Sequence, residues 1–298
     1  HDTNIVDHIQ STLIKDIKKV YKNLELSDTD SLMDVLVEIY DATGDKFFMI
    51  IDEWDAICRE FDPKSKAMEN YVNFLRRMFK SVDAYKVFAG VYMTGILPIK
   101  KQNTQSALNN FWEYSMVQPG PLAKYYGFTK AEVQTLCEKH GMPFEDMTRW
   151  YDGYSIGDEP SMFNPASVMK AFQYGGCESF WSATGSFDTV AQYIQLNYEG
   201  LKEDITTMLA GGSCKVDVIG FANDPSEVHD KNDVLTILIH LGYLAYNKQE
   251  KTCHVPNYEV GAELRRAVNS NKWNEVMRSI NASDQLLDDL LQNDAEAV

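Results

Sequence analysis

The sequence predicts an α/β fold with a parallel sheet, followed by a mainly helical region and a small α+β unit. In residues 1–115, amphipathic helix patterns alternate with two short apolar runs. Uninterrupted apolar runs are typical of parallel strands that helices cover on both faces. Helix signals then dominate residues 116–225, and a helix with two short strand patterns follows in residues 226–298. We therefore predict three regions with these bounds.

The first two predicted helices occupy residues 4–22 and 31–43. Apolar side chains recur at four-residue intervals in the first segment, which is one face of an amphipathic helix. Ser31 or Asp30 is suited to cap the second helix, which is expected to end near Gly44. Two helices thus precede the first strand.

The two predicted strands are FFMII, residues 47–51, and KVFAGVYM, residues 86–93. The second run is rich in Val and aromatic residues, which favour strands. A helix with one apolar face is predicted between them, over residues 65–82. Because strand, helix and strand follow one another at this spacing, the strands should be parallel and joined by a right-handed crossover.

A helix with a capping box is predicted over residues 127–141, GFTKAEVQTLCEKHG. Thr129 is the expected N-cap, and Glu132 stands three residues later, so each can accept a hydrogen bond from the other's backbone. Further helix signals occur after Asn164-Pro165 and over residues 186–210.

The third region has the outline of a winged-helix unit. A helix is predicted from Asn232, and LGYLAYN and CHVPN then read as strands joined by a polar turn. Several small α+β modules share this outline. After Trp273 the sequence predicts a terminal helix and an acidic end.

Composition narrows the classes of partner. The net charge of -16 opposes binding to a phosphate backbone, so nucleic acid is a less favoured partner, although the winged-helix outline keeps that alternative open. No apolar run is long enough to span a membrane, and the first residues lack the layout of a signal peptide. We therefore expect a cytoplasmic protein with no membrane partner. The five scattered cysteines are interpreted as buried apolar residues.

Groups suited to ATP chemistry follow both predicted strands. Asp52 could hold magnesium through water, and Glu53 could polarise the attacking water. Thr94, directly after the second strand, could hydrogen-bond that water or the terminal phosphate. The alternative is that the acids only end a buried strand and that Thr94 belongs to an ordinary turn. Two suitable strand ends at one sheet edge favour a nucleotide site.

Longer sequence blocks carry a family resemblance. The blocks, in order, are IIDEWD, MTGILPIKK, YYGFTKAEV, WYDGYSI, MFNPASVM, FWSATGS, LGYLAY and VPNYEV. In this order they resemble the predicted AAA-ATPase-like family of bacterial proteins, over roughly residues 45–265. The resemblance implies a P-loop NTPase core, a helical lid, a winged-helix-like unit and often a nuclease-like domain of the PD-(D/E)xK type.

The resemblance also implies roles for single residues. Asp52 and Glu53 match the Walker B acids, with Asp52 on magnesium and Glu53 and Thr94 in catalysis. Asp55 matches the last position of the family's D-E-[YW]-D pattern and is assigned to the cofactor site, behind Asp52. The block Trp150–Tyr154 is interpreted as an aromatic anchor that packs the helical region against the ATPase core.

The other half of such a site is absent from the sequence. No Gly is followed directly by Lys, so the motif G-x-x-x-x-G-K-[ST] does not occur. We therefore expect an internal fragment of a longer protein, with a partial P-loop NTPase core in residues 1–115. The longer protein is predicted to bind ATP and magnesium and to hydrolyse ATP as a switch, whereas this chain alone should be inactive.

A second hypothesis is a non-catalytic interaction or regulatory module, whose winged-helix-like region contacts a protein partner. A segment N-terminal to this chain is another expected partner. Nucleic-acid binding through the same region is the third hypothesis, and it is the one that the negative charge opposes.

Overall fold

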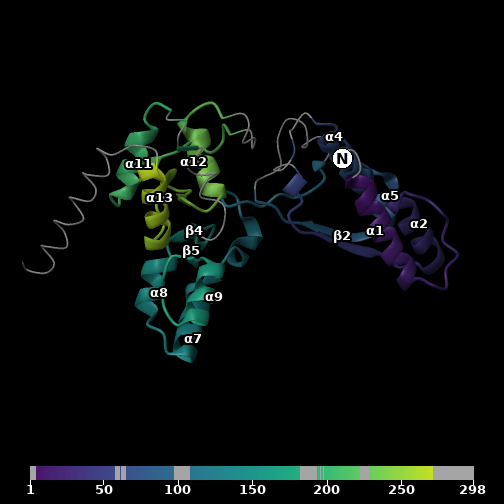
Figure 1. The fold of residues 1–298 in the computed structure, drawn as a ribbon, viewed down its shortest axis with the longest axis horizontal. Coiled ribbons are helices and arrows are strands. Elements are labelled where there is room, and N and C mark those ends of the chain that lie inside the picture. The colour runs from purple at the N-terminus through teal and green to yellow at the C-terminus, as the bar shows by residue number, and fades with distance from the viewer. Residues whose placement is uncertain are drawn as a thin grey trace, which may run out of the picture. The chain divides into compact units, whose positions relative to one another are not determined.

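The computed structural model divides into two compact units, His1–Glu113 and Tyr114–Val298, each with its own hydrophobic core. Figure 1 shows the course of the chain through both units. The structure describes residues 5–57, 61, 65–96, 108–181, 193–194, 196, 198–221 and 228–270. Cys58, the predicted helix after Trp273 and most of residues 182–197 lie outside this set.

Among its described residues, the first unit contains the three helices that its apolar patterns predict and one further short helix. Their bounds are α1 Ile5–Val20, α2 Leu32–Thr43, α4 Lys66–Lys80 and α5 Val82–Val87. Ser31 caps α2 by accepting a hydrogen bond from the Asp34 amide, and Gly44 ends it in the left-handed conformation. Of these helices, α5 was not predicted.

Two parallel strands pair in the first unit, as predicted. They are β1, Phe47–Ile51, and β2, Phe88–Met93, and their last residues lie opposite one another. The second strand begins two residues later than predicted, because Lys86 and Val87 belong to α5. Ser81 starts that short helix by accepting a hydrogen bond from the Ala84 amide.

The sheet of the first unit is covered on one face. Phe47, Met49 and Ile51 pack against the core that α1, α2, α4 and α5 form, and Figure 1 shows α1, α4 and α5 on the same side of β2. In contrast, Phe48 is 64% exposed and Ile50 is 69% exposed. The prediction that both faces are covered is therefore wrong for the described residues. The apolar run contains one half-buried row and one exposed row of side chains.

The second unit begins with short helices around a small antiparallel sheet of order β3-β5-β4. The elements are η1 Gly120–Tyr125, β3 Phe128–Thr129, α7 Lys130–His140, α8 Phe144–Tyr151, β4 Tyr154–Ile156, β5 Glu159–Phe163 and α9 Pro165–Tyr174. The predicted capping box is confirmed, because Thr129 and Glu132 exchange both hydrogen bonds at the start of α7.

The second half of this unit places helices beside an antiparallel sheet of order β6-β8-β7. The elements are α11 Leu201–Leu209, β6 Cys214–Lys215, α12 Lys231–His240, β7 Ala245–Asn247, β8 Thr252–His254 and α13 Tyr258–Ser270. The helix predicted over 186–210 is described as a regular helix only from Leu201. Neither β6 nor α13 was predicted.

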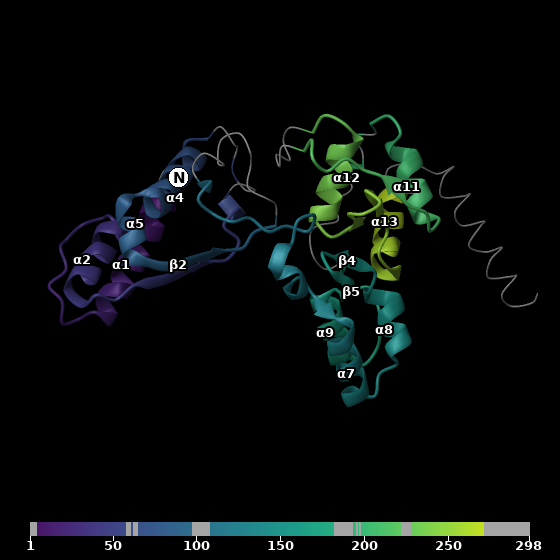
Figure 2. The same cartoon turned by 180° about the vertical axis from the view of Figure 1, so that it is seen from behind.

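One hydrophobic cluster connects α11, α12 and α13, so it includes residues on both sides of the predicted boundary at 225. Figure 2 shows these three helices together in one part of the unit, with α7, α8 and α9 in the other and β4 and β5 between them. Cys137, Cys214 and Cys253 are buried, as expected, whereas Cys177 is only half-buried, so the prediction is wrong for that residue. Within the described ranges, no helix combines the length and apolarity that a bilayer crossing needs.

The aromatic block at the end of α8 joins the two halves of the second unit. The Tyr154 hydroxyl donates to the Gly242 carbonyl at 2.6 Å, and the Trp150 ring lies 4.7 Å from the Tyr258 ring. At Gly153, which has φ 104°, a Cβ would lie 1.8 Å from the Pro256 carbonyl oxygen. Within the second unit, the block thus joins the helical part to Gly242 and to the segment 256–258, and its packing against the ATPase core stays a prediction.

Candidate functional site

The structure brings together three residues that the sequence selects. Asp52 and Glu53 form the turn after β1, and Thr94 directly follows β2. The Thr94 hydroxyl donates a hydrogen bond to Asp52 Oδ1. The Glu53 amide approaches both partners, with 3.1 Å to Asp52 Oδ1 and 3.3 Å to Thr94 Oγ1. The two strand ends therefore meet at one sheet edge.

Backbone hydrogen bonds extend the pairing of the strands into this turn. The Thr94 amide donates to the Ile51 carbonyl at 2.9 Å, and the Trp54 amide donates to the Thr94 carbonyl at 2.9 Å. Strand register thus sets the position of Thr94 relative to Asp52. This is the local reason why residues 42 positions apart in sequence make direct contact.

The two acidic side chains at the turn face solvent. Asp52 and Glu53 are both exposed, and Glu53 has φ 49°, in the left-handed region. Left-handed backbone is costly for a residue with a Cβ and is found most often in tight turns and at functional sites. The Asp52 carboxylate, exposed at a strand end, is accessible to a metal ion, to water and to a ligand.

Asp55 lies behind the exposed pair and is buried. The residue is only 4% exposed, and its Oδ2 accepts a hydrogen bond from the Ile96 amide at 3.2 Å. The neighbouring Trp54 is 6% exposed, and its carbonyl accepts a 2.8 Å hydrogen bond from the Tyr71 hydroxyl on α4. The structure therefore places Asp55 next to the predicted site but away from its solvent-facing side.

The donor set suits magnesium better than a soft metal. Magnesium keeps several waters and takes one or two carboxylates together with substrate phosphates. Asp52 supplies an exposed carboxylate of this kind, and both of its hydrogen bonds reach Oδ1. Within the described ranges, no three or more His, Cys, Asp and Glu side chains gather in a metal-binding group.

Sequence reasoning did not select Gly95 and Tyr71 as parts of this site. Gly95 leaves no room for a side chain, since a Cβ there would lie 2.7 Å from Trp54 Nε1. Its position directly after Thr94 was a usable signal, whereas Tyr71 was indistinguishable from the other apolar positions of α4.

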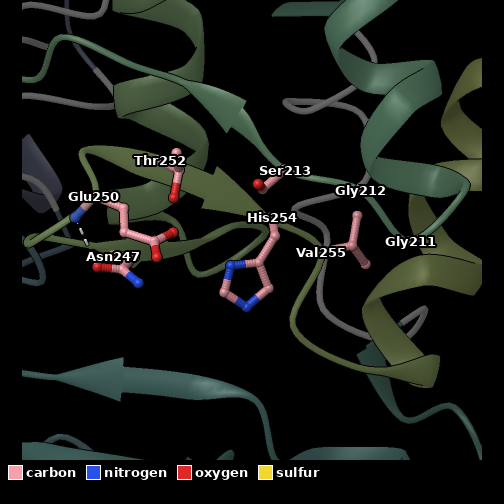
Figure 3. A pocket seen from close by; sticks show the side chains of 8 residues that line it. All are labelled: Gly211, Gly212, Ser213, Asn247, Glu250, Thr252, His254 and Val255. Carbon is pink, nitrogen blue, oxygen red and sulfur yellow. Dashed lines mark hydrogen bonds between the residues drawn. The ribbon is translucent and has the colours of Figure 1, made fainter.

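A separate hollow of about 370 Å³ lies in the second unit. Figure 3 shows it between the turn before β6 and the hairpin of β7 and β8. The lining residues are Gly211, Gly212, Ser213, Asn247, Glu250, Thr252, His254 and Val255. Asn247 is occupied within the hairpin, because its Oδ1 accepts hydrogen bonds from the Gln249 and Glu250 amides at 3.0 Å. This hollow contains none of the residues selected from the sequence.

By its geometry, the protein is a mixed α/β chain with acidic residues at the carboxyl edge of a small parallel sheet. Comparison with known families adds a match for the first part of the chain. Residues 2–104 match the model of the family described as "Predicted AAA-ATPase". The family resemblance is thereby confirmed for this part of the chain, which contains both parallel strands and all four selected residues.

One similar curated protein is an "Uncharacterized protein in vnfD 5'region" from Azotobacter chroococcum mcd 1. It is 21% identical over 275 residues, which cover 88% of this chain and 50% of the relative. The chain therefore spans about half the length of this relative. No solved structure matches the chain.

Proposed function

We propose that the turn after β1 and the end of β2 form the metal-binding and water-binding half of an ATP site. This proposal rests mainly on the direct hydrogen bond from Thr94 to Asp52 at the carboxyl edge of two parallel strands. Ligands of open α/β sheets bind at this edge. The family match over residues 2–104 supports the same assignment.

Each residue has a distinct proposed role. The Asp52 carboxylate holds the water shell of magnesium, which neutralises charge on the transferred phosphoryl group when bound. The exposed Glu53 carboxylate orients and polarises the attacking water. Thr94 lies close enough to hold Asp52 in place and to contact the water or the terminal phosphate. The complete protein is then an ATP-hydrolysing molecular switch.

The phosphate-binding half must come from outside these 298 residues, because no Gly in them is followed by Lys. We propose that the segment with this loop packs its helix on the exposed sheet face of Phe48, Ile50 and Tyr92, which are 64%, 69% and 49% exposed. Parallel sheets are normally covered on both faces, so an apolar open face suits a further helical layer. On its own, this chain should bind ATP weakly.

A second candidate is an interaction module in the second unit. In its support, the β6-β8-β7 sheet and α12 share one hydrophobic cluster, as the predicted winged-helix-like unit would require. The net charge of -16 opposes nucleic acid as that partner. A gel-shift titration at two salt concentrations separates the partners, since salt-sensitive binding would indicate nucleic acid and its absence would favour a protein.

The ATP-site proposal is tested with Glu53→Gln in the natural protein that contains this chain. The substitution keeps the size of the side chain and removes its charge, so ATP binding should persist while turnover falls roughly 100-fold or more. Glu69→Gln, at an exposed position in the first turn of α4, is the matched control. Unchanged turnover would remove Glu53 from the mechanism. A natural protein without a phosphate-binding loop lysine would refute the ATPase assignment.

A further inference from the structure

The buried side of the candidate site contains a contact between the two strand-end turns. Asp55 Oδ2 accepts the Ile96 amide at 3.2 Å, and a Cβ on Gly95 would lie 2.9 Å from Asp55 Oδ1. Both carboxylate oxygens thus lie against the Gly95-Ile96 segment. This segment directly follows Thr94, the residue that donates to Asp52.

The indole of Trp54 completes the contact. Its Nε1 and Cδ1 would lie 2.7 and 2.8 Å from a Gly95 Cβ, so the ring packs directly on the Gly95 backbone. The Trp54 amide donates a hydrogen bond to the Thr94 carbonyl at 2.9 Å. The Trp54 carbonyl accepts a hydrogen bond from the Tyr71 hydroxyl at 2.8 Å. The turn after β1 is therefore fixed to helix α4 on one side and to the turn after β2 on the other.

We propose that Asp55 is a positioning residue that holds Thr94 against Asp52, and that it contacts neither nucleotide nor metal. Burial supports this role, because a carboxylate in a residue 4% exposed is remote from a ligand that enters from solvent. Chain geometry supports it as well: strand pairing holds Thr94 from one side, and the Asp55 hydrogen bond holds Ile96 two residues further on. Its effect on ATP turnover rests on the proposed function, whereas the positioning contact does not.

Amide hydrogen exchange measured by NMR on the 298-residue chain tests the contact without nucleotide. In Asp55→Ala, the Ile96 and Trp54 amides should exchange roughly tenfold faster or more, because removing a charged acceptor costs the hydrogen bond. Asp55→Asn keeps an acceptor oxygen and should restore most of the protection. Asp45→Ala, at an exposed position just before β1, is the control. An unchanged Trp54 amide in Asp55→Ala would overturn the proposal.

Gly95→Ala gives an independent test that leaves Asp55 in place, and it decides the question if Asp55→Ala does not fold. The added Cβ should push the Thr94–Ile96 segment away and speed exchange of the Trp54 amide. Gly176→Ala is the control, because a Cβ there meets no atom within 4 Å and its φ is ordinary. Unchanged exchange in Gly95→Ala would contradict the proposal.

ATP turnover of the natural protein separates this proposal from the proposed function. Asp55→Ala should lower kcat more than it raises KM, and Asp55→Asn should recover both turnover and exchange protection. Faster exchange together with unchanged turnover would overturn the positioning role alone. Full turnover in both Glu53→Gln and Asp55→Ala would overturn the proposed function.

Discussion

A strand of the first unit and a helix of the second unit differ in how completely their side chains are covered. In the first unit, Phe48 and Ile50 of β1 remain exposed although the strand is apolar throughout. In the second unit, all eight residues from Asp233 to His240 on α12 are buried within the unit. Surface apolar residues in a row on a sheet indicate a face suited to a partner layer. The first unit thus has an open sheet face, whereas α12 of the second unit lies inside its core.

The second unit should lose most stability when a side chain is added at Gly153. Gly153→Ala forces a Cβ to within 1.8 Å of the Pro256 carbonyl oxygen at a backbone φ of 104°. We expect a loss of about 4 kcal/mol or more in the free energy of unfolding, because strain and overlap add. Urea unfolding followed by NMR signals of this unit measures it. Gly176→Ala should change stability by less than about 0.5 kcal/mol, and a similar small loss in Gly153→Ala would contradict the packing.

The contrast between covered and open apolar residues is tested directly in the first unit. Ile39 on α2 is fully buried, and Ile50 on β1 is 69% exposed. Ile39→Ala should lower the free energy of unfolding by about 2–5 kcal/mol, whereas Ile50→Ala should lower it by less than about 1 kcal/mol. Urea unfolding of the two variants compares them. Equal losses would show that the β1 face is covered in solution.

A buried histidine makes the second unit sensitive to acid. Burial lowers the pKa of His240 from its ordinary 6.5 to about 4, because the charged form is disfavoured. The contribution of the neutral His240 side chain to the free energy of unfolding is therefore complete above pH 6.5, and it is lost as the pH falls towards 4. The difference between these two pKa values corresponds to roughly 3 kcal/mol in the free energy of unfolding. His240→Gln should flatten this part of the stability profile, measured by urea unfolding at each pH.

Glu259 acts in the opposite direction and must be controlled. Burial raises the pKa of this carboxyl above its ordinary 4.5, so its protonated form favours folding and stability falls as the pH rises above 4.5. We therefore compare His240→Gln with its parent in a Glu259→Gln background, with the exposed His140→Gln as a further control. An unchanged slope between pH 6.5 and 4 would remove His240 as the cause.

The smallest expected effect concerns the turn of the candidate site. Glu53 has φ 49°, which glycine adopts at less cost. Glu53→Gly should raise the free energy of unfolding of the first unit by roughly 1 kcal/mol, whereas Glu53→Gln should leave it unchanged. Urea unfolding compares the two variants. Destabilisation in Glu53→Gly would show that the carboxylate supports the fold rather than a function.

Local patterns predicted several elements to within a few residues. β1 has the predicted bounds, and the Thr129–Glu132 capping box starts α7 as expected. Residues Lys86 and Val87 were misassigned, because a short capped helix at Ser81 overrides the strand preference of Val. The two-residue strand β6 is too short to produce a periodic pattern.

The candidate site was predictable only in part. Strand order predicts that Asp52, Glu53 and Thr94 meet, because parallel strands place their carboxyl ends together. The burial of Asp55 was not predictable, since it depends on the packing of Trp54 against Gly95. Nor could an apolar run show whether one face or both faces of β1 are covered.

We propose that the Asp52 carboxylate holds magnesium for an ATP site at this sheet edge. The most direct measurement is the magnesium dependence of ATP turnover in the natural protein that contains this chain, compared between wild type, Asp52→Asn and the exposed control Asp45→Asn. We predict that Asp52→Asn raises the magnesium concentration for half-maximal turnover roughly tenfold or more, and that Asp45→Asn does not. An unchanged magnesium dependence in Asp52→Asn would show that Asp52 does not hold the ion.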